Sequence, residues 1–170
     1  MEFSELIYQR YSSRDFTSKD VADEQIDSIL AAIESAPSSG NDQAYKIAVV
    51  RDPDLRERIA LASRNQKWMT KAPVLLVFFG DVDRYRERIG ERLQYGPVQD
   101  PTIAMVYAQL AAVDVGLGSC WVAPHAGEEA AKILGLDGNL RLAGILPIGW
   151  PADSRPKRRR RKPEEWTVRL

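Results

Sequence analysis

The stretch PVLLVFF, residues 73–79, decides the fold of this chain. Its apolar side chains do not alternate with polar ones, so both faces of the predicted strand are expected to be buried. A strand of this kind lies in the middle of a sheet that helices cover on both sides. Residues 45–50 (YKIAVV), 119–123 and 142–148 are predicted to supply the other strands.

Helical periodicity marks the segments between these strands. Apolar residues at i, i+3, i+4 and i+7 predict a short amphipathic helix over residues 2–10. Asp23 is predicted to cap a helix that stops at Pro37, and Asp52-Pro53 and Asp100-Pro101 are each predicted to open one. Further helices are predicted at residues 82–93 and 128–134. About four strands and five or six helices predict α+β or α/β layering.

Composition excludes several classes of protein. The chain has 170 residues, 44% of them apolar, but no apolar run approaches the roughly 20 residues of a membrane-spanning helix. The N-terminus lacks the positive charge and apolar run of a secretory signal, so a cytoplasmic location is expected. One cysteine, Cys120, rules out an internal disulfide, and with His125 as the one histidine no four-ligand Cys/His zinc site forms within one chain.

The net charge of zero hides an uneven distribution of charge. Residues 155–170 carry eight basic and two acidic side chains, a balance of +6, and residues 1–154 have the opposite balance of −6. Such a tail is typical of contact with an anion: nucleic acid, a membrane surface, a phosphorylated ligand or an acidic chain. The acidic body argues against nucleic acid, because a dedicated binder spreads its positive charge over a folded face.

Three short segments are candidates for contact with a ligand. Residues 10–14 (RYSSR) combine two guanidinium groups with hydroxyl groups, which suits phosphate, although arginines also favour a helix C-terminus. Residues 37–43 offer amide groups to a ligand or simply form a turn. The glycines of residues 116–121 end a helix or let a flat ligand approach the backbone. Cys120 is interpreted as a small buried apolar side chain and His125 as non-catalytic.

Together these segments resemble the signatures of the nitroreductase-like FMN-dependent flavoproteins. Residues 10–16 (RYSSRDF) resemble the family's Arg-x-Ser-x-Arg-x-Phe signature, and residues 36–43 (APSSGNDQ) resemble its Ala-Pro-Ser-x-x-Asn-x-Gln signature. Residues 116–121 look like the third signature, and residues 146–163 look like the fourth. The four occur in family order. Tyr11 replaces a frequent second arginine, and Ala44-Tyr45 replaces Pro-Trp.

The resemblance implies an α+β, nitroreductase-like three-layer fold in which helices flank a central, mostly antiparallel sheet. It implies one FMN-binding domain over residues 1–170, an intertwined homodimer, and a basic extension, residues 152–170, that packs on the partner subunit. Pro37, Ser38, Ser39 and Asn41 would reach the flavin from the partner. Arg161, with Arg159 as the second choice, would join Arg10 and Ser12 around the phosphate. The cofactor-binding residues that it implies are Arg10, Tyr11, Ser12, Arg14, Pro37, Ser38, Ser39, Asn41, Val122, Ala123, Arg159 and Arg161.

The resemblance also implies an activity. FMN would accept hydride at N5 from NADH or NADPH and reduce a nitroaromatic, quinone or enone acceptor by a ping-pong mechanism. No catalytic side chain is needed, and Arg14 would give electrostatic support to the reduced ring. Residues 83–101 are expected to shape the substrate slot, and no metal or membrane partner is expected. The alternatives are a non-catalytic flavin-binding protein and a nucleic-acid-binding protein that uses the basic tail.

Overall fold

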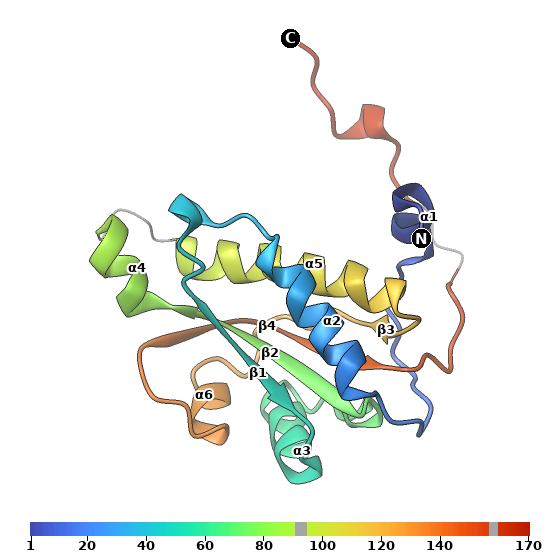
Figure 1. Cartoon of the computed structure of the whole chain (residues 1–170), viewed down its shortest axis with the longest axis horizontal. Coiled ribbons are helices and arrows are strands. Elements are labelled where there is room, and N and C mark those ends of the chain that lie inside the picture. The colour runs from blue at the N-terminus through green and yellow to red at the C-terminus, as the bar shows by residue number, and fades with distance from the viewer. Residues whose placement is uncertain (91–94, 157–159) are drawn as a thin grey trace.

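A computed structural model describes residues 1–90, 95–156 and 160–170 as three layers around an antiparallel sheet (Figure 1). The strands are β1 (Tyr45–Val50), β2 (Val74–Asp81), β3 (Gly118–Ser119) and β4 (Leu140–Gly149). Their order in the sheet is β1-β2-β4-β3, and each neighbouring pair is antiparallel. The helices are α1 (Phe3–Gln9), α2 (Asp23–Glu34), α3 (Pro53–Ala62), α4 (Val82–Ile89), α5 (Gly96–Asp114) and α6 (Glu129–Ile133). Short 3-10 turns lie at Ser39–Asn41, Lys67–Lys71 and Pro163–Glu165.

Strand β2 has both faces buried, as its unbroken apolar run predicts. Leu76 and Phe78 pack in one core with α2 and α5, whereas Leu75, Val77 and Phe79 pack in a second core with α3 and α6. All five side chains are fully buried. The fold is therefore the predicted α+β arrangement, with a central antiparallel sheet between two layers of helices.

Helix α5 starts one turn earlier than the sequence predicts. It begins at Gly96 rather than at Asp100-Pro101, so Pro101 lies inside the helix. The first turn approaches β2 closely, because a Cβ atom built on Gly80 would lie 1.9 Å from the carbonyl oxygen of Pro97. Such an approach is possible only where the strand residue has no side chain. Glycine at position 80 therefore fixes where the N-terminal end of α5 rests.

The other element boundaries either confirm the predictions from the sequence or correct them. Asp52 caps α3 and accepts a hydrogen bond from the backbone N–H of Leu55 at 2.9 Å, as predicted. Asp23 is not a cap but the first residue of α2, and the Gln25 side chain accepts the backbone N–H of Ala22 instead. The strand predicted at 119–123 shortens to β3 and an isolated bridge at Val122. Helix α4 ends before the predicted residue 93, and residues 91–94 lie outside the described part.

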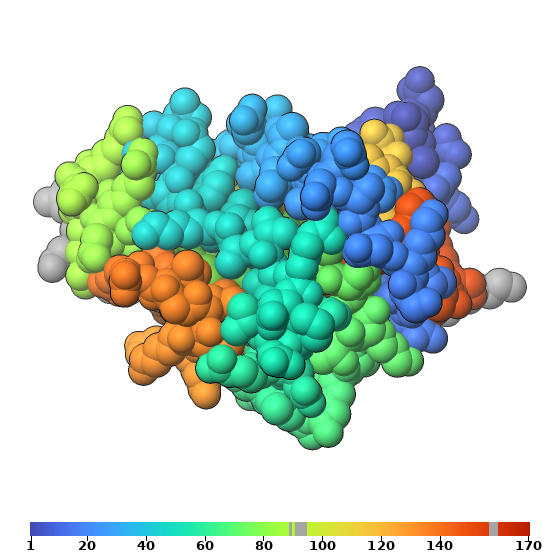
Figure 2. Space-filling model, turned by 60° about the horizontal axis from the view of Figure 1, so that its bottom comes forward, coloured from blue at the N-terminus to red at the C-terminus, as the bar shows by residue number. Residues whose placement is uncertain are grey.

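Residues 11–17 and 150–153 lie side by side, and Figure 2 shows blue N-terminal and orange-red C-terminal atoms together at one end of the molecule. Phe16 bridges Pro151, and the backbone N–H of Thr17 donates to the carbonyl of Trp150 at 2.9 Å. Helix α1 packs near the C-terminal end of α5 but buries none of its own residues. Within the described ranges no helix is long and apolar enough to cross a membrane.

Candidate functional site

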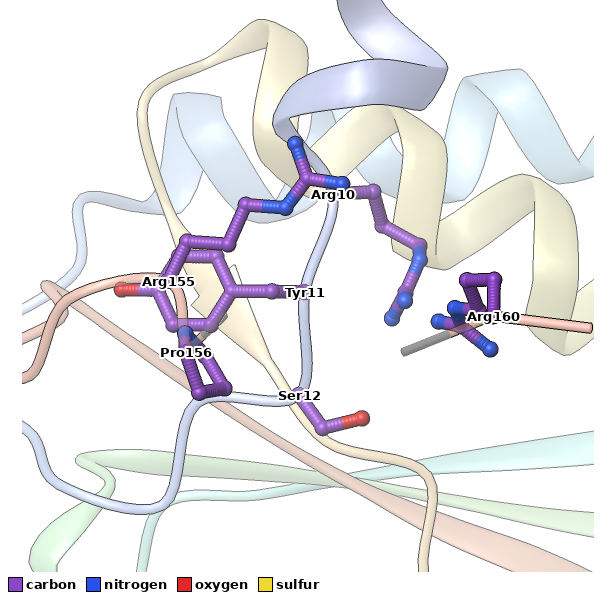
Figure 3. Close-up of a pocket in the computed structure, with 6 residues that line it drawn as sticks. All are labelled: Arg10, Tyr11, Ser12, Arg155, Pro156 and Arg160. Atoms are coloured by element: carbon purple, nitrogen blue, oxygen red, sulfur yellow. The ribbon is translucent and has the colours of Figure 1, made fainter. Parts of the chain in front are cut away.

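The segment after α1 forms one wall of a polar cleft, which we call the arginine cleft (Figure 3). The guanidinium groups of Arg10 and Arg160 and the hydroxyl of Ser12 point toward the same space, while Arg155 reaches toward α1. The described lining contains no acidic side chain. It consists of Arg10, Tyr11, Ser12, Arg155, Pro156 and Arg160.

The electrostatics of the arginine cleft favour an anion. Burial lowers the pKa of Arg10 most, and the positive charge of Arg160 lowers it further; Arg155 adds the smallest effect, less than the opposing effect of Cys120. Guanidinium groups that repel one another are stabilised by a phosphate, which accepts several charge-assisted hydrogen bonds at once. The donors present therefore fit a phosphate group.

The structure distinguishes among the arginines of the C-terminal run. Arg160 lines the cleft, whereas the Arg161 guanidinium pairs with the carboxylate of Glu165 at 3.6 Å and is absent from the described lining. Arg159, the other predicted residue, lies outside the described residues. Arg155, which the sequence analysis did not single out, places its guanidinium 4.1 Å from the centre of the Tyr8 ring. Consecutive arginines carry no local signal that identifies which of them turns inward.

Asp153 holds the segment that carries Arg10 and Ser12. Its carboxylate accepts the hydroxyl of Ser13, the backbone N–H of Arg14 at 2.9 Å and the phenol of Tyr11 at 3.2 Å. Burial alone would raise the pKa of Asp153, but these hydrogen bonds together hold it below its usual value. The phenol of Tyr11 also donates to the backbone carbonyl of Asp153 at 2.8 Å, so its hydroxyl points away from the guanidinium groups although Tyr11 lines the cleft. The Arg14 side chain is exposed and lies 5.8 Å from the Trp68 ring centre.

A second group of predicted residues borders a large, mainly apolar depression, which we call the apolar hollow. Pro37, Ser38 and Ser39 line it together with side chains from α5 and the half-exposed Trp121. The predicted Val122-Ala123 pair directly follows Trp121 in the chain. Both backbone groups of Val122 are already engaged, because they pair with the backbone of Ile145 at 2.9 and 3.0 Å.

Two buried carboxylates fix the loop that carries Pro37, Ser38 and Ser39. Asp100 on α5 accepts the backbone N–H of Ser39 at 2.8 Å and its hydroxyl at 3.1 Å. Asp42, within the loop, accepts guanidinium hydrogen bonds from Arg84 at 3.2 Å and Arg88 at 2.8 Å, both on α4. Asn41 has a positive φ of 57°, a strained conformation that such anchoring maintains. The serine hydroxyl of Ser39 is thus used to hold the loop.

The arginine cleft and the apolar hollow lie at opposite ends of α5. The first turns of α5 bind Ser39 through Asp100, whereas its last residue, Asp114, pairs with the N-terminal amine of Met1 at 3.2 Å. Between Asp100 and Asp114 an α-helix rises about 21 Å. One chain therefore presents the two predicted groups of residues as two separate surfaces.

Comparisons with known proteins give the relatives of this chain. The chain matches the Nitroreductase family over residues 7–67 and 60–150. It is 32% identical to FMN reductase (NAD(P)H) of Bacillus subtilis strain 168, over 91% of this chain and 67% of that protein. It is 29% identical to a putative NADH dehydrogenase/NAD(P)H nitroreductase of Archaeoglobus fulgidus, over 91% of this chain and 88% of that protein.

Solved structures support the same relationship. The hypothetical oxidoreductase YcnD from Bacillus subtilis has a TM-score of 0.86 and 28% identity, over 96% of this chain and 72% of that one. A BluB-like flavoprotein from Clostridium difficile 630 has a TM-score of 0.83 and 26% identity, over 100% of this chain and 99% of that one. The match to the family spans β1, β2, α5 and all of β4, and it includes the start of the arginine cleft at Arg10. This chain belongs to the nitroreductase family.

Proposed function

We propose that this chain is an FMN-dependent oxidoreductase that transfers hydride from NADH or NADPH to an oxidised acceptor. The observation that carries the proposal is the arginine cleft, where Arg10, Ser12 and Arg160 offer a set of donors suited to the phosphate of FMN. Some of the similar proteins are named FMN reductase or NAD(P)H nitroreductase, which supports FMN as the cofactor and NADH or NADPH as the source of hydride.

The residues of this chain bind and orient the cofactor. Arg10, Ser12 and Arg160 hold the phosphate, and Arg155 adds positive charge at the edge of the cleft. Arg14, which is exposed and follows Arg10 by four residues, is proposed to reach the pyrimidine side of the flavin, where a cation stabilises negative charge. When bound, FMN supplies the hydride transfer itself, so no side chain needs to act as nucleophile or strong base.

The complete site is proposed to form between two copies of the chain. Because the arginine cleft and the apolar hollow are separated along α5, we propose that Pro37, Ser38, Ser39 and Asn41 reach the flavin from the partner subunit. Apolar side chains left uncovered support a homodimer: Phe3 is 67% exposed, Ile7 48% and Val106 48%. Residues 152–170 are proposed to pack on the partner, and Trp166 in this extension is 63% exposed.

The apolar hollow is proposed to receive the acceptor. Its lining is mainly apolar and includes the indole of Trp121, which suits a flat nitroaromatic, quinone or enone. Residues 98–100, within the segment expected to shape the substrate slot, form part of this lining. Nicotinamide and acceptor are proposed to occupy the same space in turn, in a ping-pong sequence.

The visible absorption spectrum of the purified protein tests the proposal, followed by anaerobic titration with NADH and then NADPH. We expect a flavin spectrum that bleaches with one nicotinamide or both and recovers when an acceptor is added. A protein that is colourless and cannot be reconstituted with FMN would contradict the proposal. A flavin-binding protein without turnover would keep its flavin oxidised in both titrations.

A further inference from the structure

Asp153 receives hydrogen bonds from three of the four residues that follow Arg10. The hydroxyl of Ser13, the backbone N–H of Arg14 and the phenol of Tyr11 all donate to its carboxylate. We propose that Asp153 is a positioning residue that shapes the arginine cleft for the FMN phosphate without touching it. This inference rests on the proposed function.

Residues 10–14 include one wall of the arginine cleft. This segment is extended and pairs with β3, because the backbone N–H of Ser13 donates to the carbonyl of Ser119 at 3.1 Å. Ser13 is completely buried, so its hydroxyl requires an acceptor, and the Asp153 carboxylate is one of its two. Ser12 lies between Tyr11 and Ser13, and both of these neighbours donate hydrogen bonds to Asp153. These two contacts therefore set the direction in which the Ser12 side chain points.

The C-terminal segment forms the other wall of the cleft. The backbone N–H of Ala152 donates to the carbonyl of Asp15 at 2.9 Å, so the chain is still attached to the body immediately before Asp153. Two residues later Arg155 already lines the cleft, and Arg160 follows. Asp153 is therefore the last described anchor before the arginines of the C-terminal segment, and it fixes the separation of the two walls.

The sign of the expected effect separates positioning from simple electrostatics. A carboxylate near a phosphate repels it, so an effect of charge alone would make FMN bind more tightly once the charge of Asp153 is removed. Positioning predicts the opposite, because the donors of the cleft lose their alignment. The hydrogen bonds that lower the pKa of Asp153 keep this carboxylate charged at neutral pH, so the two predictions differ clearly.

The test compares FMN with riboflavin, which has the same ring and ribityl chain but no phosphate. In Asp153→Asn we expect the ratio of FMN affinity to riboflavin affinity to fall about tenfold, the equivalent of one hydrogen bond to a charged group. Asp15→Asn is the matched control: it removes an equal charge from the same region, but its carboxylate binds Lys71 at 2.8 Å. In this control the ratio should stay the same or rise.

Each outcome decides between the alternatives. A wild-type protein that binds neither flavin would overturn the proposed function itself. A wild-type protein that prefers FMN, with an unchanged or higher preference in Asp153→Asn, would overturn the role of Asp153 alone. An equal loss of both affinities would also overturn it, because that result indicates general destabilisation. If Asp153→Asn does not fold, Ser13→Ala removes one of the same hydrogen bonds and should lower the ratio, and an unchanged ratio there refutes the inference.

Discussion

The replacement Asp100→Ala tests whether α5 holds the loop at Ser39. Asp100 is 2% exposed, and its two oxygens accept the backbone N–H and the hydroxyl of the same serine at 2.8 and 3.1 Å. Alanine keeps the helix intact but removes both acceptors. The loop that lines the apolar hollow would then lose its attachment to α5.

The magnitude follows from these two contacts. A hydrogen bond to a charged group contributes roughly 1.5–3 kcal/mol, and loss of both would approach twice that value. Ser39 is half-buried, so water can replace part of the two lost hydrogen bonds. Alanine also removes the cost of burying the Asp100 carboxylate, which offsets a further part of the loss. We therefore expect the free energy of unfolding to fall by about 2–3 kcal/mol. Asp114→Ala, at the other end of α5, removes an exposed ion pair and should cost at most about 1 kcal/mol.

Urea denaturation of the wild type and both variants measures these differences, and FMN titration of the same samples measures the effect on the site. A change of less than about 0.5 kcal/mol in Asp100→Ala, or an equal change in Asp114→Ala, would refute the assigned role of Asp100. In that case the loop would be held by Asp42 and the arginines of α4 instead.

Three further predictions address other parts of the molecule. Arg160→Ala should raise the Kd of FMN about 10- to 100-fold in a fluorescence titration, whereas Arg161→Ala should change it less than about twofold; equal effects would contradict the assignment of Arg160. Gly80→Ala should lower the free energy of unfolding in urea by about 1–3 kcal/mol or more, because its Cβ would clash with the Pro97 carbonyl, and wild-type stability would refute this. The lowered pKa of Asp153 stabilises the fold fully above about pH 4, and this contribution is lost as pH falls through the lowered value. The stability difference between wild type and Asp153→Asn should therefore shrink in urea titrations below pH 4, and a difference independent of pH would contradict it.

The two Asp-Pro pairs of the sequence show why local pattern predicts one helix start and misses another. Asp52-Pro53 and Asp100-Pro101 have the same local signal, and the first opens α3 as predicted. The second lies inside α5, because the Asp100 carboxylate binds Ser39, 61 residues away in the chain, rather than capping its own helix. A tertiary contact of this kind leaves no periodic trace in the sequence.

In the candidate site, too, some residues could be predicted from local sequence and others could not. Arg10 and Ser12 could be predicted because they follow a short amphipathic helix in a recognisable signature, and the structure places both in one cleft. Arg160 could not be selected from a run of arginines, since its direction depends on the path of residues 151–156. That path is set by Asp153, whose importance arises from contacts across more than 130 residues of chain.

The separation of the arginine cleft and the apolar hollow along α5 has a genetic consequence. If each flavin is held by the cleft of one chain and the hollow of the other, a chain damaged only in its cleft and a chain damaged only in its hollow can restore each other. In the mixed dimer one site carries both defects and the other carries neither. Co-expression of two inactive variants, one altered at Arg10 and one at Asp100, should then yield up to half of the wild-type activity per mixed dimer, a pattern of interallelic complementation.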